Sequence, residues 1–251
     1  MGRAKPLAAM FLVSIGSVMF LSACKKAEAP IHDLTATATP AATATQTAIA
    51  VAEPRSGDEV TVPVTVKGVA SVFEGTVVIA VESADGSKTF CKTFTTASEG
   101  APGRGSFEAQ IDFPPPSSAT DGRVRVYSES PKDGSVQNLV SVPVVISPEQ
   151  PAIVIDSPLC GAEVKSPITV KGTASLFEAA LVVVVKDSLG QELARTSVLA
   201  SESAPARGTF SQELSFSLPG SVENGSIEAF STSARDGSVI NVFSVPVTLT
   251  P

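Results

Sequence analysis

The chain has few of the residues from which catalytic and metal sites are built. Its 251 residues include no Trp, one Tyr, one His and three Cys. The one histidine, His32, lies ahead of the part with strand patterns, so the folded part has no histidine base. No Cys/His cluster has zinc-site spacing, and no serine stands in a Gly-x-Ser-x-Gly turn. We therefore expect no metal, no cofactor, no catalytic residue and no small-molecule substrate; a hydrolase is a remote alternative.

Positive charge is also scarce. The chain carries 18 Lys and Arg against 25 Asp and Glu, a formal net charge of −7. An acidic protein is repelled by nucleic acid and by anionic lipid surfaces. We therefore expect no nucleic-acid partner, and any membrane contact must come from something other than charge.

The N-terminal segment predicts export. Arg3 and Lys5 precede an apolar stretch over residues 7–20, and Leu-Ser-Ala-Cys follows, ending at Cys24. This order is typical of a secretory signal. A small-residue cleavage site directly before a cysteine resembles the lipobox of bacterial lipoproteins, which implies cleavage after Ala23 and a diacylglycerol on Cys24. The alternative is an ordinary signal peptide with an incidental cysteine.

Residues 24–48 form a Thr/Ala-rich, low-complexity stretch with almost no large apolar side chains. Such a segment cannot offset its ordering entropy, so it is expected to be a disordered tether. With residues 1–23 as signal peptide, this places the protein in the bacterial cell envelope, outside the cytoplasm, held to a membrane through its acyl chains.

An internal repeat dominates the rest of the chain. The nine residues Val66–Glu74 return 104 positions later as Val170–Glu178, with seven of the nine identical. Asp-Gly-Ser and Ser-Val-Pro-Val segments also recur. The two copies span 49–147 and 152–251, joined by the short double-proline linker 148–151. Each copy has the size of a single-core domain.

Within each copy the apolar residues alternate with a period of two, which predicts strands. Val60, Val62, Val64 and Val66 alternate with polar residues or proline, while residues 76–81 form a continuous apolar run that suits a central strand. Pro63 in copy one, like Pro167 in copy two, predicts an edge or bulged strand, because proline cannot donate to a ladder. About seven short strands per copy and no amphipathic helix predict an all-β fold of two β-sandwiches.

The repeated residues resemble a known family. The stretch Val-Lys-Gly-x-Ala-Ser-x-Phe-Glu, a later Gly-x-Phe strand and a later Asp-Gly-Ser are similar to the immunoglobulin-like domain of bacterial spore germination, over both copies. The resemblance implies two tandem immunoglobulin-like sandwiches, a setting in envelope lipoproteins, relevance to germination and no catalytic residues. Antibody domains are similar in architecture only, since Trp and a cysteine pair within each copy are missing.

Three motif positions recur in both copies, and we assign each a structural role. The glycines should mark a bend or bulge, the phenylalanines should plug one end of the core, and the glutamates should accept backbone N–H groups in the following turn. The alternative for the glutamates is contact with a ligand. The residues concerned are Gly68, Phe73 and Glu74 in copy one, and Gly172, Phe177 and Glu178 in copy two.

The copies also differ in places that could carry a specific function. Outward positions of one strand hold Arg123, Arg125 and Tyr127 in copy one. The matching positions of copy two are Ser226, Glu228 and Phe230. These differences fit two solvated faces, a binding strip in copy one, or an inter-domain contact between opposite charges.

Cys91 and Cys160 have no cysteine at the matching positions, where Arg195 and Ser56 stand. In an exported protein they could form an inter-domain disulfide, or remain two separate thiols.

The function expected from the sequence is non-catalytic. We expect a lipid-anchored envelope protein that presents two immunoglobulin-like domains to an envelope protein or a glycan. The alternative is a structural or assembly component of the envelope or spore.

Overall fold

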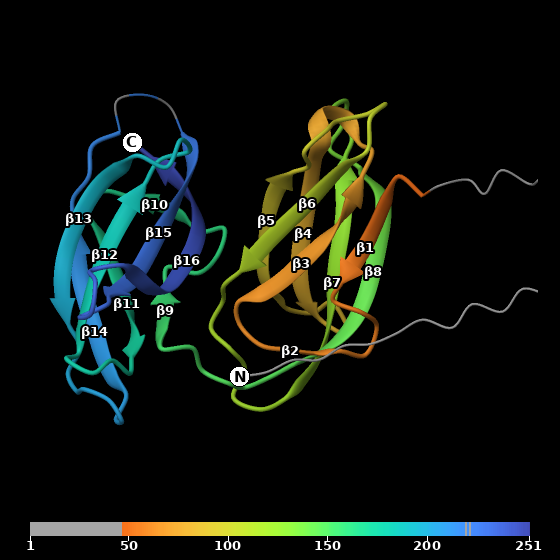
Figure 1. The fold of residues 1–251 in the computed structure, drawn as a ribbon. Helices are drawn as coiled ribbons and strands as arrows, with labels where there is room; N and C mark the ends of the chain where they lie inside the picture. The colour runs from red at the N-terminus through yellow and green to blue at the C-terminus, as the bar shows by residue number, and fades with distance from the viewer. Residues whose placement is uncertain (1–46, 219, 221) are drawn as a thin grey trace, which may run out of the picture. The chain divides into compact units, whose positions relative to one another are not determined.

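The computed structural model describes residues 47–218, 220 and 222–251 (Figure 1). The predicted signal peptide, the cleavage position after Ala23, the lipidation site Cys24 and nearly all of the tether lie outside the described residues. No helix in the described part of the chain is long and apolar enough to cross a membrane.

The first domain contains a three-stranded and a five-stranded sheet. The smaller sheet has the order β1 (Ile49–Glu53), β3 (Val64–Ala70), β6 (Gly105–Ile111). The larger has the order β2 (Glu59–Val60), β8 (Val136–Ile146), β7 (Thr120–Glu129), β4 (Thr76–Ser83), β5 (Thr89–Thr96). A short 3-10 turn, η1 (Phe73–Gly75), connects β3 to β4. Neighbouring strands are antiparallel except β2 and β8.

The second domain repeats this topology. Its smaller sheet has the order β9 (Ile153–Ser157), β11 (Ile168–Ala174), β14 (Gly208–Leu214). Its larger sheet has the order β10 (Glu163–Lys165), β16 (Val239–Thr250), β15 (Glu223–Thr232), β12 (Ala180–Lys186), β13 (Glu192–Leu199). The all-β prediction of two tandem immunoglobulin-like sandwiches is confirmed, since Figure 1 shows two sheet pairs and the strand order is the same in both.

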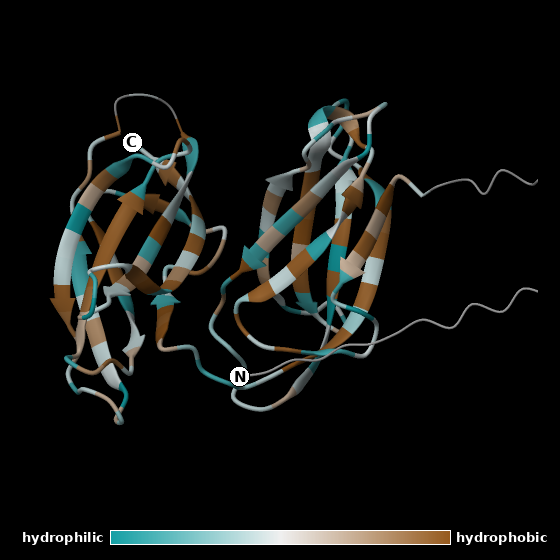
Figure 2. Cartoon of the chain, viewed as in Figure 1, coloured by the Kyte–Doolittle hydropathy of each residue, from teal (hydrophilic) through white to brown (hydrophobic). Residues whose placement is uncertain are grey.

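The core lies between the two sheets of each domain. On β3, every second residue from Val64 to Ala70 is buried, while the three residues between them are partly exposed. Figure 2 shows this alternation as brown and teal bands along the strands. The apolar run of β4 is buried on both faces, and β4 lies between β7 and β5, as predicted for a central strand.

The prediction that Pro63 and Pro167 lie on an edge or bulged strand is wrong. β3 and β11 are the middle strands of their sheets, and each proline stands directly before the first paired residue, Val64 or Ile168. The alternating run from Val60 to Val66 is two strands in different sheets, β2 and β3. Because proline occupies the crossing between the sheets, its missing N–H is never needed by a ladder.

Gly68 and Gly172 lie beside an irregularity in strand pairing and under an aromatic ring. The β1–β3 register shifts between Val51 and Glu53, next to Gly68, and the β9–β11 register shifts next to Gly172. A Cβ added to Gly68 would stand 2.6 Å from Cζ of Phe107 and would also strike the carbonyl oxygen of Ala50. At Gly172 the added Cβ would meet Phe210 at the same 2.6 Å. Each glycine therefore leaves the space that a core phenylalanine fills.

Gly68→Ala and Gly172→Ala should each destabilise their own domain by about 3 kcal/mol, because the new methyl meets a ring and a rigid carbonyl. Chemical denaturation followed by far-UV circular dichroism measures this. Gly220→Ala is the control, since an added Cβ there meets nothing within 4 Å. Equal effects at Gly68 and Gly220 would contradict the assignment.

Candidate functional site

The two motif phenylalanines are exposed, so their predicted role as core plugs is wrong. The exposed fraction is 63% for Phe73 and 87% for Phe177. The residues just before them, Val72 and Leu176, are buried and take the core position instead. The following turn brings the backbone to positive φ, 53° at Glu74 and 54° at Ala179. The chain therefore reverses immediately after each core residue and leaves the ring outside.

The motif glutamates do not close this turn. Backbone groups do: the Gly75 N–H donates to the Val72 carbonyl at 3.0 Å, and the Ala179 N–H donates to the Leu176 carbonyl at 3.1 Å. Glu74 and its counterpart in copy two are both exposed, and no hydrogen bond to either carboxylate occurs among the described residues. Both carboxylates are therefore open to solvent, and contact with a ligand stays a prediction.

A hairpin tip between β7 and β8 lies against this turn in domain one. Asn138 takes a φ of 55° and donates from Nδ2 to Ser128 Oγ at 3.0 Å. In domain two, Asn241 has a φ of 56° and donates to Ser231 Oγ at 2.9 Å. The sequence pattern did not reveal this repeated hydrogen bond, although Asn recurs at a spacing of 103 residues.

The hairpin turns themselves are held by aspartate. Oδ1 of Asp133 accepts hydrogen bonds from the Ser135 hydroxyl at 2.7 Å and the Ser135 N–H at 3.1 Å, and these bonds lower the pKa of Asp133. Asp236 and Ser238 repeat the arrangement with the same two distances. Each aspartate therefore stabilises a turn. Among the described residues there is no group of three or more side chains able to hold a metal ion.

A groove of about 330 Å³ runs between η1 and the hairpin in domain one. Its lining combines an aromatic ring with carboxylate, amide and hydroxyl groups: Phe73, Glu74, Ser128, Pro131, Gln137 and Asn138. We define this as the motif-end surface of domain one. It is the candidate functional site, because it brings the most strongly repeated segment of the sequence to an open, chemically mixed surface.

The motif-end surface of domain two is more apolar. Strand register places Ile240 where domain one has Gln137, and Leu199 where it has Thr96. Both replacements are exposed, as are Val242 and Phe177. The two domains thus share the turn and the exposed ring but differ in the surrounding side chains.

The predicted basic strip is a set of internal ion pairs. Arg123 Nη2 lies 2.9 Å from Glu82 Oε2, and Arg125 Nη1 lies 3.0 Å from Glu82 Oε1. Tyr127 is buried, and the Arg125 guanidinium stands 5.4 Å from its ring centroid. Burial is the largest influence on Glu82 and raises its pKa, but the two arginines together outweigh it and the pKa is lowered. The two arginines therefore share one carboxylate, which fixes both guanidinium groups and leaves a net charge of +1 on this partly exposed cluster.

Domain two has the same pair with its charges exchanged. Lys186 occupies the position of Glu82, and its Nζ lies 2.6 Å from Glu228 Oε2, at the position of Arg125. Each charge is thus paired within its own sandwich, which favours a structural role for this face over an inter-domain contact. A cation also covers the buried aromatic in both domains, with Arg195 at 5.4 Å from Phe230.

Cys91 of β5 is bonded to Cys160 in the second domain, with their Cα atoms 5.2 Å apart. Register shows that Ala194, not Arg195, is equivalent to Cys91: Val81 pairs with Cys91 and Val185 with Ala194. The sequence comparison was wrong by one position because the segment between the paired residues Val185 and Ala194 is one residue shorter than the segment between Val81 and Cys91.

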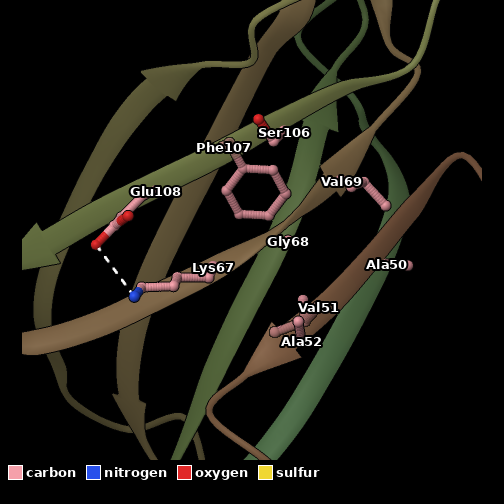
Figure 3. A pocket seen from close by; sticks show the side chains of 9 residues that line it. All are labelled: Ala50, Val51, Ala52, Lys67, Gly68, Val69, Ser106, Phe107 and Glu108. Carbon is pink, nitrogen blue, oxygen red and sulfur yellow. Dashed lines mark ion pairs between the residues drawn. The ribbon is translucent and has the colours of Figure 1, made fainter.

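A second, shallower depression of about 380 Å³ lies over β1, β3 and β6 (Figure 3). Lys67 stands 3.4 Å from Glu108 and 3.7 Å from Glu53, so its charge is neutralised. The equivalent glutamate positions in domain two are Ser157 and Ser211. Because its charged groups pair with one another and do not recur, this depression is a weaker candidate.

Two arginines that the sequence analysis did not single out fix the start of each domain. Arg104 Nη1 donates to the Thr47 carbonyl at 2.8 Å, and Arg207 Nη2 donates to the Pro151 carbonyl at 2.6 Å. The repeated Arg-Gly-(Ser/Thr)-Phe segment was the available signal. Each arginine holds the chain just ahead of its first strand.

Sequence comparison agrees with this repeated architecture. The model of the immunoglobulin-like domain of bacterial spore germination matches residues 48–135 and 152–238. The chain belongs to this family. The family resemblance expected from the motif is therefore confirmed, and the spore germination immunoglobulin-like domains account for most of the chain. A search of curated proteins finds no match.

Solved structures with similar folds come from varied settings. The BSP domain of a biofilm-associated protein is 18% identical, with 80% of this chain and 29% of that chain covered and a TM-score of 0.25. The fibronectin(III)-like modules of Clostridium thermocellum CbhA are 15% identical, with 80% and 94% covered and a TM-score of 0.24. The D1–D4 fragment of ICAM-5 is 11% identical, with 80% and 53% covered and a TM-score of 0.26. Similarity at this level carries no argument about function.

The ion pairs around Glu82 yield a stability prediction. Glu82→Gln should destabilise domain one by about 3 kcal/mol, because two partly buried guanidinium groups lose their carboxylate. Since the folded pKa of Glu82 is lowered, its contribution is present above the unfolded value of 4.5 and is lost as pH falls through the folded value. Denaturation curves between pH 3 and pH 7 measure this loss, which should be absent in Glu82→Gln.

A matched rescue uses the arrangement of domain two. The triple variant Glu82→Lys, Arg123→Ser and Arg125→Glu copies Lys186, Ser226 and Glu228. It should recover most of the stability that Glu82→Gln loses. A triple variant no more stable than Glu82→Gln would show that the exchanged pairs are not equivalent.

Proposed function

We propose that this protein is a non-catalytic binding protein of the bacterial cell envelope, anchored through a lipid on Cys24, and that its motif-end surfaces bind an envelope protein or glycan. One observation carries the proposal: the phenylalanine of the repeated motif is exposed in both domains, at 63% and 87%.

Folding alone does not explain why these two rings are exposed. Burying a phenylalanine side chain contributes about 2 kcal/mol, and neither domain gains this at the motif position. A single exposed apolar residue is ordinary, but here the same ring is exposed twice in the segment that the copies share most closely. Aromatic side chains are common energetic centres of binding interfaces, which supports a role in recognition.

The lining of the domain-one groove supports binding of a polar partner. Gln137 contributes an amide and Glu74 a carboxylate, and neither side chain makes a hydrogen bond or ion pair within the part of the chain that the structure describes. These groups surround the Phe73 ring. Planar amides and an aromatic face suit either a sugar ring or a peptide.

A structural or assembly role is the second candidate, and domain two favours it. Phe177, Leu199 and Ile240 are exposed in domain two, and strand register places the last two where domain one has Thr96 and Gln137. An apolar surface of this kind is typical of contact with another protein subunit.

Phe73→Ser and Phe177→Ser should weaken binding at least tenfold while changing unfolding free energy by less than about 0.5 kcal/mol, since exposed side chains contribute little to folding. Binding is measured by sedimentation with purified cell-wall glycan and by cross-linking to detergent-solubilised envelope proteins. Phe94→Ser is the control, because Phe94 is 54% exposed but lies on β5, outside the motif. Equal binding by all three variants and the unchanged chain would contradict the proposal that the motif-end surfaces bind a partner.

The anchor has its own test. Cys24→Ala should abolish incorporation of radiolabelled palmitate and move the protein from the membrane fraction to the soluble fraction. Retention of label or of membrane association in the variant would contradict lipidation at this cysteine.

A further inference from the structure

Asp112 is a buried carboxylate with an incomplete set of partners. It follows β6 in domain one and is 6% exposed. Oδ2 accepts a hydrogen bond from the Ser244 N–H of β16, in domain two, at 3.0 Å. Oδ1 is buried and has no hydrogen-bond partner among the described residues. Leaving a buried carboxylate oxygen unsatisfied is costly, so this position calls for an explanation.

The neighbours of Asp112 belong to the junction between the domains. The adjacent Phe113 is fully buried, with its ring 5.2 Å from that of Phe90. Phe90 precedes Cys91, which is bonded to Cys160 of the second domain. Residues 45–251 form one compact unit. Asp112 therefore lies where a hydrogen bond and a covalent bond both link the two sandwiches.

No nearby charge compensates this carboxylate. β16 contains no charged residue. Lys88, directly before β5, stands over the Phe90 ring at 4.6 Å, and Lys92 of β5 pairs with Glu129 at 2.9 Å. On β6, Glu108 pairs with Lys67. None of these side chains forms an ion pair or hydrogen bond with Asp112, so an ionised Asp112 is stabilised by one backbone N–H only.

We propose that Asp112 is a pH-sensitive latch between the two domains, closed when the carboxyl is protonated and loosened when it ionises. The proposal goes beyond binding at the motif-end surfaces. The Cys91–Cys160 bond keeps the domains together in both states, so the latch changes how tightly they pack and not whether they are joined.

The direction of the effect follows from burial. Burial raises the pKa of Asp112 from 3.8 to about 6, and the Ser244 N–H opposes this only in part. The pKa of Asp112 is higher when the domains are packed than when they are separated. The carboxyl therefore contributes its full stabilisation of packing below pH 3.8, and this contribution is lost as the pH rises through about 6. The packing equilibrium should therefore weaken by up to about 100-fold between acid and neutral pH.

The latch is specific to one of the two domains. Register pairs Ile111 with Val64 and Leu214 with Ile168, which makes Ser215 the residue equivalent to Asp112. A neutral serine at the matching position of domain two shows that the fold itself does not need a carboxylate there. The aspartate therefore serves the junction.

Hydrogen exchange at two amides of β16 tests the proposal. The probe is the chain from residue 24 onward with Cys24→Ala and the disulfide intact. The Ser244 N–H reports the latch, while the Thr248 N–H, bonded within domain two to the Ala162 carbonyl at 2.9 Å, reports that domain alone. Protection of Ser244 relative to Thr248 should fall by about 25-fold from pH 4.5 to pH 7.5, because part of the effect is already lost at pH 4.5. The Asp112 carboxyl carbon should titrate in the same range by NMR.

Asp112→Asn is the matched variant, because it keeps the acceptor for Ser244 and cannot ionise. Its Ser244-to-Thr248 ratio should not change with pH. Asp112→Ser, which copies domain two, serves the same purpose if the Asn variant does not fold. Titration of Asp112 below pH 5, a constant ratio in the unchanged chain, or the same pH dependence in a variant would each overturn the latch.

Discussion

The contact between a phenylalanine ring and a glycine on the neighbouring strand determines much of each sandwich. Phe107 can lie over β3 only because Gly68 has no side chain, and Phe210 lies over Gly172 in the same way. With no Trp and no disulfide inside either sandwich, each core depends on Val, Ile and Leu packed around such rings. In each small sheet the buried ring fills the space that the glycine of the neighbouring strand leaves.

The duplication separates what the fold needs from what each domain adds. The Gly–Phe contact, the Asn–Ser bond of the hairpin and the arginine at each domain start appear in both copies. The ion pairs of Glu82 with Arg125 and of Lys186 with Glu228 show that this sheet face accommodates a pair of opposite charges in either order. Asp112 and the cysteine bridge have no counterparts and belong to the link between domains.

Strand positions could be predicted from the sequence because alternation follows directly from burial of one sheet face. Pro63 was misassigned because a run of alternating residues does not reveal that the chain changes sheets within it. The exposure of Phe73 could not be predicted, since Val72 and Phe73 are adjacent apolar residues and the sequence pattern does not show which of them the turn leaves outside. The contact of Asp112 joins residues 132 positions apart, and no local pattern encodes it.

The bridge between Cys91 and Cys160 closes a covalent ring whose two cysteines are 69 positions apart in the sequence. This ring contains the end of β5, then β6, β7, β8, the double-proline linker 148–151 and β9. A protease that cuts once anywhere within it, the exposed linker included, leaves both fragments in one molecule. Separation of the domains therefore requires two chemical events, a cut and a reduction, and an intact band on a non-reducing gel does not imply an uncut chain.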